Sequence, residues 1–267
     1  MVSHAAEKRK DCVRPEKSVI ARNLWDEMFM RRQAQKRLGR RGGGADVNPE
    51  QSIHLAGSNL GKYRHVCAFF HNQDQEDKVV VPFFKEGIDR GGKAFYVSYP
   101  QMYVHLFHEL SHAGIEVKLA EKRGQLEVKK PEEVYVRDGR FDQDAVLALI
   151  QEVLRKGAEQ GFTLTRYVSR MEWAVKYRVG MNELLEYEAR LNLVLPNFQD
   201  PVICVYNLAQ FKADVVIDIL RTHPMVIIGK LMAKNPFFVP PDVFLQELSE
   251  RRANTRPGTV RLQKHEQ

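Results

Sequence analysis

The sequence predicts an α/β protein with a mostly parallel sheet and helices on both faces. Short apolar runs alternate with longer amphipathic runs from residue 63 to residue 252. The run at residues 63–71, Tyr-Arg-His-Val-Cys-Ala-Phe-Phe-His, has the length and composition of a buried strand, and a charged amphipathic run begins directly after it at Asp74. A strand, a short loop and a helix form the first half of a βαβ unit, and repetition of that unit builds a parallel sheet covered on both faces.

Glycine and proline mark the boundaries of the predicted elements. Gly91 and Gly92 follow the first amphipathic run, and Pro100 opens the next one. We predict strands at residues 63–71, 93–98, 124–128, 163–169, 201–206 and 225–229. We predict helices at residues 74–90, 100–112, 142–160, 181–195, 212–221 and 242–252.

The chain divides into four predicted parts. Near the N-terminus, apolar residues at helical spacing mix with arginines, which fits either a helix-turn-helix or a single basic helix, and Gly42, Gly43 and Gly44 then break the chain. We predict a basic helical DNA-binding segment at residues 1–38, a flexible linker at 39–52, an α/β domain at 53–252 and a polar tail at 253–267.

The positive charge is concentrated in the N-terminal segment. Residues 1–50 hold twelve Lys and Arg against seven Asp and Glu, a net charge of +5, whereas the rest of the chain carries a net charge of +2. Such a segment either binds a polyanion, most commonly nucleic acid, or is a solvated tail. We predict that the segment binds DNA as part of a homodimer through Arg22, Arg31, Arg32, Lys36 and Arg37.

The sequence argues against a membrane protein and against a secreted one. It contains no run of eighteen apolar residues, and residues 1–14 lack the apolar core of a signal peptide. The three cysteines, Cys12, Cys67 and Cys204, are widely spaced and form no zinc-finger pattern, which is typical of reduced thiols. We expect a cytoplasmic protein without a membrane partner.

The first predicted strand is not followed by a phosphate-binding loop. A Walker A loop needs GxxxxGK[ST] at this place, but residues 71–76 read His-Asn-Gln-Asp-Gln-Glu, without glycine or lysine. Asp74, Glu76 and Asp77 would repel phosphate at the start of the helix, and no GxGxxG occurs in the chain. We therefore predict neither ATP hydrolysis nor dinucleotide binding, and we expect no cofactor.

Candidate ligand-binding residues lie on or after three predicted strands. His65 and Cys67 share one face of the first strand because side chains alternate along a strand. Glu172 and Trp173 follow the fourth major strand, where α/β domains place functional side chains, and the indole would form an apolar wall. Tyr206 lies on the fifth strand. We predict that a small organic effector binds near the ends of these strands, at His65, Cys67, Glu172, Trp173 and Tyr206.

His65 and Cys67 also fit two ligands of a metal ion. A zinc site needs three or four ligands, and Cys204 and His223 would complete this set only if the fold brought them close. A Cys-His catalytic pair is less convincing, because no third group can be named to orient it. We favour a packed cysteine and a hydrogen-bonded histidine in the core, and therefore predict no metal and no catalytic residues.

Several short motifs occur together in one order. They lie at residues 65–70, 124–128, 137–141, 171–173, 186–188, 220–224 and 235–237. Together they resemble the MEDS domain, a sensory domain of methanogens and methylotrophs, over about residues 53–248. The resemblance implies a RecA/KaiC-type fold without a Walker A loop, a small hydrocarbon derivative as the ligand, and fusion to a DNA-binding or signalling module.

The resemblance, taken with the basic segment, implies a ligand-responsive transcriptional repressor and not an enzyme. It would control a dichloromethane dehalogenase gene, or a similar one-carbon or haloalkane gene, and a small halogenated or hydrocarbon-derived effector would release it. Two alternatives stay open. One is a sensing module that binds a signalling protein and no DNA, and the other is an enzyme that acts on small alkyl compounds.

Overall fold

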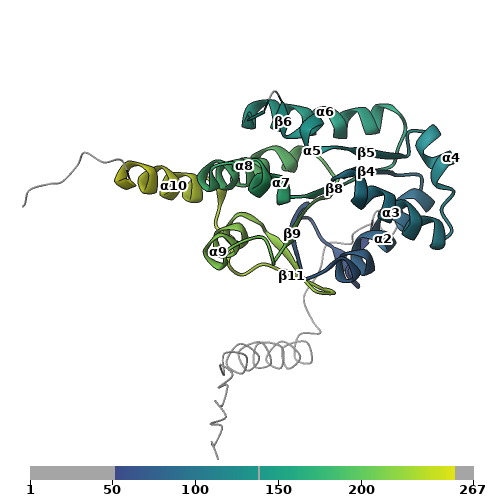
Figure 1. Cartoon of the computed structure of the whole chain (residues 1–267), viewed down its shortest axis with the longest axis horizontal. Coiled ribbons are helices and arrows are strands. Elements are labelled where there is room, and N and C mark those ends of the chain that lie inside the picture. Colours follow the sequence, from purple (N-terminus) through teal and green to yellow (C-terminus); the bar gives the residue numbers. More distant parts are fainter. Residues whose placement is uncertain (1–51, 138, 256–267) are drawn as a thin grey trace, which may run out of the picture. The chain divides into compact units, whose positions relative to one another are not determined.

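The computed structural model describes residues 52–137 and 139–255 (Figure 1). Contacts divide the chain into residues 1–48 and residues 49–267, and all described residues belong to the second unit. The predicted DNA-binding residues, nearly all of the predicted linker and most of the predicted tail lie outside the described residues: Arg22, Arg31, Arg32, Lys36 and Arg37, with residues 39–51 and 256–267.

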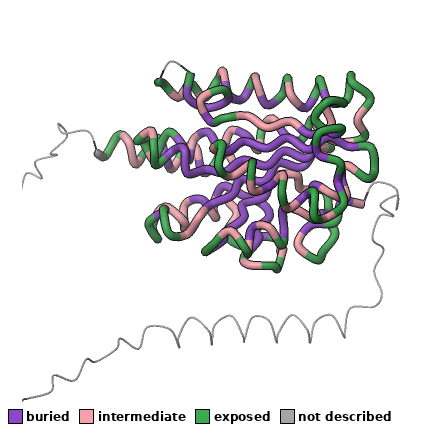
Figure 2. Tube along the Cα trace, turned by 45° about the vertical axis from the view of Figure 1, so that its right-hand side comes forward, coloured by how far each residue is buried: buried purple, intermediate pink, exposed green. Residues whose placement is uncertain are grey.

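A seven-stranded sheet forms the centre of the described unit. Its strands follow the order β11-β10-β3-β9-β8-β4-β5, and all neighbours are parallel except β10 and β11. The strands of this sheet are β3 (His65–Phe70), β4 (Lys93–Val97), β5 (Leu126–Lys129), β8 (Thr165–Arg170), β9 (Val202–Asn207), β10 (Met225–Ile228) and β11 (Leu231–Lys234). The inner strands are almost wholly buried (Figure 2). The predicted α/β class with a mostly parallel sheet is therefore confirmed.

Helices cover both faces of the sheet. One apolar core joins the sheet to α2 (Gln73–Asp89), α3 (Pro100–His112) and α4 (Val117–Lys122). The other core joins the opposite face to a second set of elements. This set comprises α5 (Pro131–Val134), α6 (Gln143–Glu159), α7 (Glu172–Lys176), α8 (Met181–Val194), η2 (Leu195–Asn197), α9 (Ala213–Thr222) and α10 (Pro241–Thr255). None of the described helices is long and apolar enough to cross a membrane.

Local chemistry sets the helix boundaries. Asn72 caps α2 by accepting a hydrogen bond from the backbone N–H of Gln75 at 3.0 Å, and Asp142 caps α6 through Ala145 at 3.1 Å. Gly91 follows α2 with φ +74°, a conformation that favours glycine. The six predicted helices and six predicted strands all occur, with ends displaced by a few residues.

Several short elements were not predicted. They are the hairpins β1–β2 and β6–β7, the edge strand β11 and the helices α4, α5 and α7. The two hairpins consist of β1 (Ile53–Leu55), β2 (Ser58–Leu60), β6 (Val136–Arg137) and β7 (Arg140–Phe141). Elements of two to six residues are too short to show a period in the sequence. The β6–β7 hairpin matters for the site, because it carries part of the motif at residues 137–141.

Candidate functional site

A cluster of four buried polar side chains lies between the sheet and α8. The carboxylate oxygen Oε2 of Glu188 lies 3.2 Å from Nε2 of His65, 3.4 Å from Nε2 of His223 and 3.6 Å from Sγ of Cys204. Sγ of Cys204 lies 3.5 Å from Nε2 of His65. All four residues are at most 1% exposed. Histidine nitrogens, a thiol and a carboxylate are metal-ligating groups, so these four residues form a candidate cation site.

Four different elements bring these groups together. His65 opens β3 and Cys204 is central in β9, where it pairs with Cys67 in the parallel register of the two strands. Glu188 projects from α8, and His223 is the C-cap of α9 directly before β10. His223 is fully buried against α8, so the fold does bring Cys204 and His223 close to His65, which was the condition set for a metal site.

The surroundings fix the charge state of the cluster. Burial and the neighbouring His223 lower the pKa of His65 to about 4, against the opposing effect of Glu188. Burial would raise the pKa of Glu188, but the two imidazoles outweigh it and hold that pKa below its usual range. The Glu188 oxygen Oε1 also accepts a 2.5 Å hydrogen bond from the hydroxyl of Tyr206. These shifts favour the charged form of the Glu188 carboxylate and the neutral form of His65.

A second buried network occupies the place where a phosphate loop would lie. Arg170, at the end of β8, contacts Glu76 of α2 at 3.0 Å, Glu172 at 2.8 Å and the amide oxygen of Gln73 at 2.6 Å. Tyr96 donates to the other oxygen of Glu76 at 3.1 Å. The start of α2 is thus occupied by carboxylates already paired to an arginine. The absence of ATP hydrolysis stays a prediction.

Replacing Glu76 with glutamine should change the pH dependence of stability. Burial raises the pKa of Glu76 from 4.5 to about 7, outweighing the opposing effect of Arg170. Between these pH values the carboxyl of Glu76 keeps its proton in the folded protein but has lost it in the unfolded chain, so proton binding stabilises the folded state. This stabilisation is complete below pH ~4.5 and is lost as the pH rises through ~7. The unfolding free energy of the wild type, relative to Glu76→Gln, should fall by about 3 kcal/mol across this window. Denaturant unfolding at a series of pH values measures it, and a constant or rising difference would contradict the assignment.

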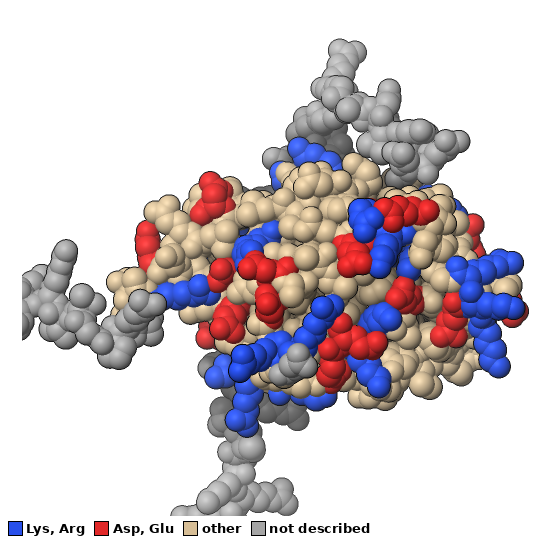
Figure 3. Space-filling model, turned by 90° about the horizontal axis from the view of Figure 1, so that it is seen from above, with Lys and Arg blue, Asp and Glu red and all other residues tan. Residues whose placement is uncertain are grey.

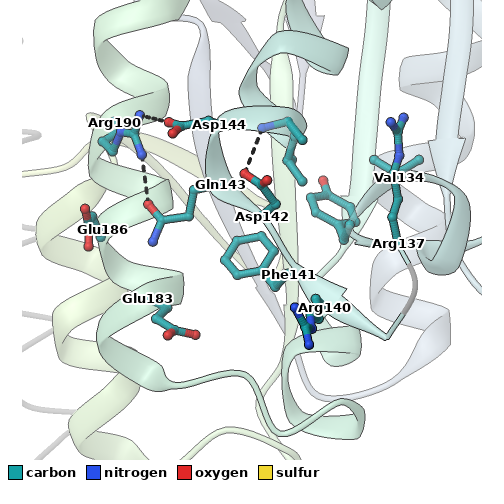
Figure 4. A pocket seen from close by; sticks show the side chains of 13 residues that line it. Val134, Arg137, Arg140, Phe141, Asp142, Gln143, Asp144, Glu183, Glu186 and Arg190 are labelled. Carbon is teal, nitrogen blue, oxygen red and sulfur yellow. Dashed lines mark hydrogen bonds and ion pairs between the residues drawn. The ribbon is translucent and has the colours of Figure 1, made fainter.

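A surface hollow of about 820 Å³ opens between α6, α8 and the β6–β7 hairpin (Figure 4). Its apolar wall comes from Val134, Tyr135 and Phe141, and charged groups surround it. The charged groups are Arg137, Arg140, Asp142, Asp144, Glu183, Glu186 and Arg190. Arg190 contacts Gln143 and Asp144 across the mouth (Figure 4). Glu186, on the same helix as Arg190, pairs instead with Arg252 at 2.6 Å.

An aromatic layer lies directly behind this hollow. Trp173 stacks on Tyr135, with ring centroids 4.3 Å apart. The ring centroids of Trp173 and Phe141 are 5.0 Å apart. Phe141 also meets Tyr187 at 5.7 Å. Nε1 of Trp173 and the hydroxyl of Tyr187 are buried and find no hydrogen-bond partner among the described residues. An open hollow with an apolar wall and charged groups around it is the form expected of a small-molecule site.

The five residues predicted to bind effector do not form one group. His65 and Tyr206 both contact Glu188, whereas Cys67 donates to the carbonyl oxygen of Met225 at 3.6 Å. Glu172 belongs to the Arg170 network, and Trp173 belongs to the aromatic layer. Cys67, Trp173 and Tyr206 do lie in the same apolar core. We expected all five residues near the ends of their strands. Glu172, Trp173 and Tyr206 do lie at or just after the ends of β8 and β9, whereas His65 is the first residue of β3 and Cys67 is in its middle.

Sequence reasoning missed Glu188 as a site residue. It is a charged residue on the buried face of α8, between Leu184 one turn before it and Leu191 one turn after it, and all three are fully buried. A carboxylate at a core position of an amphipathic helix is costly unless it is paired. That position in the helical pattern was the available signal.

Comparisons with known proteins agree on a family. The family model of the MEDS domain, described as MEthanogen/methylotroph, DcmR Sensory domain, matches residues 64–224, more than half of the chain and inclusive of all four cluster residues. The chain is 26% identical over 179 residues to "Transcriptional repressor DcmR" of Methylorubrum extorquens (strain DSM 6343 / CIP 106787 / DM4).

That match covers 66% of this chain and 64% of the repressor. Among solved structures, a KaiC-like protein from Pyrococcus horikoshii OT3 aligns with a TM-score of 0.45 and 14% sequence identity. The alignment covers 64% of this chain and 73% of the KaiC-like chain. The extent of the family match shows that the chain belongs to the MEDS domain family.

Proposed function

We propose that this protein is a ligand-responsive transcriptional repressor. The supporting observation is its relationship to a sensory domain family and, within 179 aligned residues, to a transcriptional repressor. In this proposal the N-terminal segment binds operator DNA as part of a homodimer in the cytoplasm. The α/β unit binds a small halogenated or hydrocarbon-derived effector, and effector binding releases the DNA.

The charge distribution supports assigning DNA binding to the N-terminal segment. Residues 1–50 carry a net charge of +5, which suits a phosphate backbone. On the face of the α/β unit drawn in Figure 3, acidic and basic side chains are interspersed and form no continuous basic surface. We therefore assign the phosphate contacts to the five predicted basic residues, Arg22, Arg31, Arg32, Lys36 and Arg37.

We propose that the effector binds in the hollow against the aromatic layer. The hollow, at about 820 Å³, lies within the usual range for small-molecule sites, and a compound of a few heavy atoms needs only its apolar wall. Phe141 is half-buried in this wall and contacts Trp173, which makes Trp173 the predicted residue best placed to respond. His65, Cys67, Glu172 and Tyr206 are assigned to the buried layers that support this region.

Effector binding should change the fluorescence of Trp173. In a Trp25→Phe background Trp173 is the single tryptophan, and a halogenated effector such as dichloromethane in the adjacent hollow should quench it. Phe141→Ser removes the ring between the hollow and the indole of Trp173. It should weaken the apparent affinity for the effector by about tenfold or more, which corresponds to a loss of ~1.4 kcal/mol of binding free energy.

Phe162→Ser is the matched control for this titration. Phe162 is also half-buried and flanks the opposite end of α6, beside Lys93. Its loss should leave both the quenching and the affinity unchanged. Equal effects of the two substitutions, or saturable binding with no response of Trp173, would place the effector elsewhere.

A mobility-shift assay with the DNA upstream of the neighbouring genes tests the repressor function. The full chain should form a discrete complex with this DNA that persists in the presence of excess random DNA. The complex should dissociate when dichloromethane is added. Effector binding without a DNA complex would favour the signalling module. Turnover of the alkyl halide would favour the enzyme, and Cys67→Ala would then show whether that thiol takes part.

A further inference from the structure

The buried cluster has the dimensions of a metal coordination shell. Bonds of about 2.0–2.3 Å from a Zn²⁺ ion to nitrogen, oxygen and sulfur place tetrahedral ligands roughly 3.3–3.8 Å apart. Oε2 of Glu188 lies 3.2, 3.4 and 3.6 Å from the donor atoms of His65, His223 and Cys204. Nε2 of His65 lies 3.5 Å from Sγ of Cys204, and all four donor atoms lie within 4.8 Å of one another.

The outer nitrogens of both histidines are committed as donors. Nδ1 of His223 lies 2.8 Å from the carbonyl oxygen of Ile219, which can only accept, so Nδ1 carries the proton. Nδ1 of His65 lies 3.1 Å from Oδ1 of Asn192, whose amide nitrogen donates to the carbonyls of Glu188 and Thr222. Both Nε2 atoms therefore present lone pairs to the carboxylate in the neutral histidines. Metal-binding histidines are oriented in this way by a partner on the other ring nitrogen.

Protons alone do not satisfy this arrangement. The two imidazole rings are 4.0 Å apart, which disfavours two positive charges in a buried site. A proton on His223 would face Glu188 at 3.4 Å, longer than a charge-assisted hydrogen bond of about 2.7–2.9 Å. Nε2 of His223 is buried and has no hydrogen-bond partner among the described residues. The single thiol proton of Cys204 cannot serve all three acceptors.

We propose that His65, Glu188, Cys204 and His223 bind one divalent transition-metal ion, with Zn²⁺ as the expected occupant. Two nitrogens, one sulfur and one oxygen suit Zn²⁺, whereas Mg²⁺ and Ca²⁺ prefer oxygen ligands alone. Four protein ligands close the coordination shell, so the ion is structural. It joins β3, β9, α8 and the end of α9, and α8 also carries Glu183 and Glu186 of the hollow. The proposal does not depend on the repressor function.

The test uses the full chain with His108→Gln and His112→Gln, because exposed His108 and His112, with half-buried Glu109, are a second group among the described residues that could hold a metal ion. After equilibration with Zn²⁺ and dialysis, metal analysis should find about one ion per chain. Cys204→Ser should weaken binding by at least ~100-fold, since loss of an outer-shell partner alone costs ~10–100-fold. Cys67→Ser is the matched control, an equally buried thiol on the neighbouring strand, and should keep the ion.

Cobalt substitution supplies a second readout, and its first result comes from the chain with the four proposed ligands intact. Co²⁺ bound to the full chain should give the intense visible bands of a tetrahedral site and a thiolate-to-cobalt charge-transfer band. That band should vanish in Cys204→Ser and persist in Cys67→Ser. The proposal is overturned if the full chain, refolded with Zn²⁺ or Co²⁺, holds no ion and shows no thiolate band, or if Cys204→Ser retains both.

Discussion

Replacing Arg170 with methionine should lower the free energy of unfolding by about 3–5 kcal/mol at pH 8. The guanidinium lies between Glu76 and Glu172, and all three side chains are buried. Its loss leaves two carboxylates in the core without a counter-ion, which is the costly way to break a buried ion pair. Chemical denaturation of the folded protein measures the change.

Two further variants separate this effect from simple loss of a side chain. Arg190→Met removes an arginine from a partly exposed pair with Asp144, so it should cost less than ~1 kcal/mol. Combining Arg170→Met with Glu76→Gln should recover part of the loss, because one uncompensated charge is removed. Equal costs for Arg170→Met and Arg190→Met would show that the buried network contributes nothing specific.

Deleting residues 1–44 should abolish operator binding and leave the α/β unit folded. The contact division falls after Asn48, so the truncation removes no part of the described fold. The deleted segment holds all five basic residues assigned to DNA. Each phosphate contact contributes about −0.9 to the slope of log K against log salt, so Arg31→Gln, which removes one contact from each protomer of the homodimer, should make that slope shallower by about two.

The opposite terminus provides the control for this deletion. Residues 256–267 also contain basic residues, Arg256, Arg261 and Lys264, but we assign them no DNA contact. Their removal should leave operator affinity unchanged, and circular dichroism and effector binding should be normal for both truncated chains. Full affinity in the chain lacking residues 1–44 would place the DNA-binding surface on the α/β unit.

The sequence was sufficient for the main elements because their signals are local. Pro100 marks the start of α3, and the apolar run after Arg64 marks β3. The antiparallel edge strand β11 was not predicted because its apolar run is only three residues long, and its four residues are partly or fully exposed.

The buried cluster was not predictable in the same way. His65 and Cys204 are separated by 139 residues, and their contact is set by the order of strands in the sheet. Cys67 and Cys204 had equal claims from composition, yet the β3–β9 register and the position of α8 place only Cys204 against Glu188. Side-chain convergence of this kind depends on packing between distant elements, which residue spacing does not encode.

We expect effector and operator DNA to bind to two coupled states of one protein. Coupling between two sites is reciprocal, so dichloromethane should weaken operator binding by the same factor by which operator DNA weakens dichloromethane binding. We expect that factor to lie in the range of about 5–150-fold. Measuring both affinities, each with and without the other ligand, at one salt concentration tests this directly. Equal factors above one are the predicted result, and an operator affinity that stays constant while the effector site saturates would contradict the account.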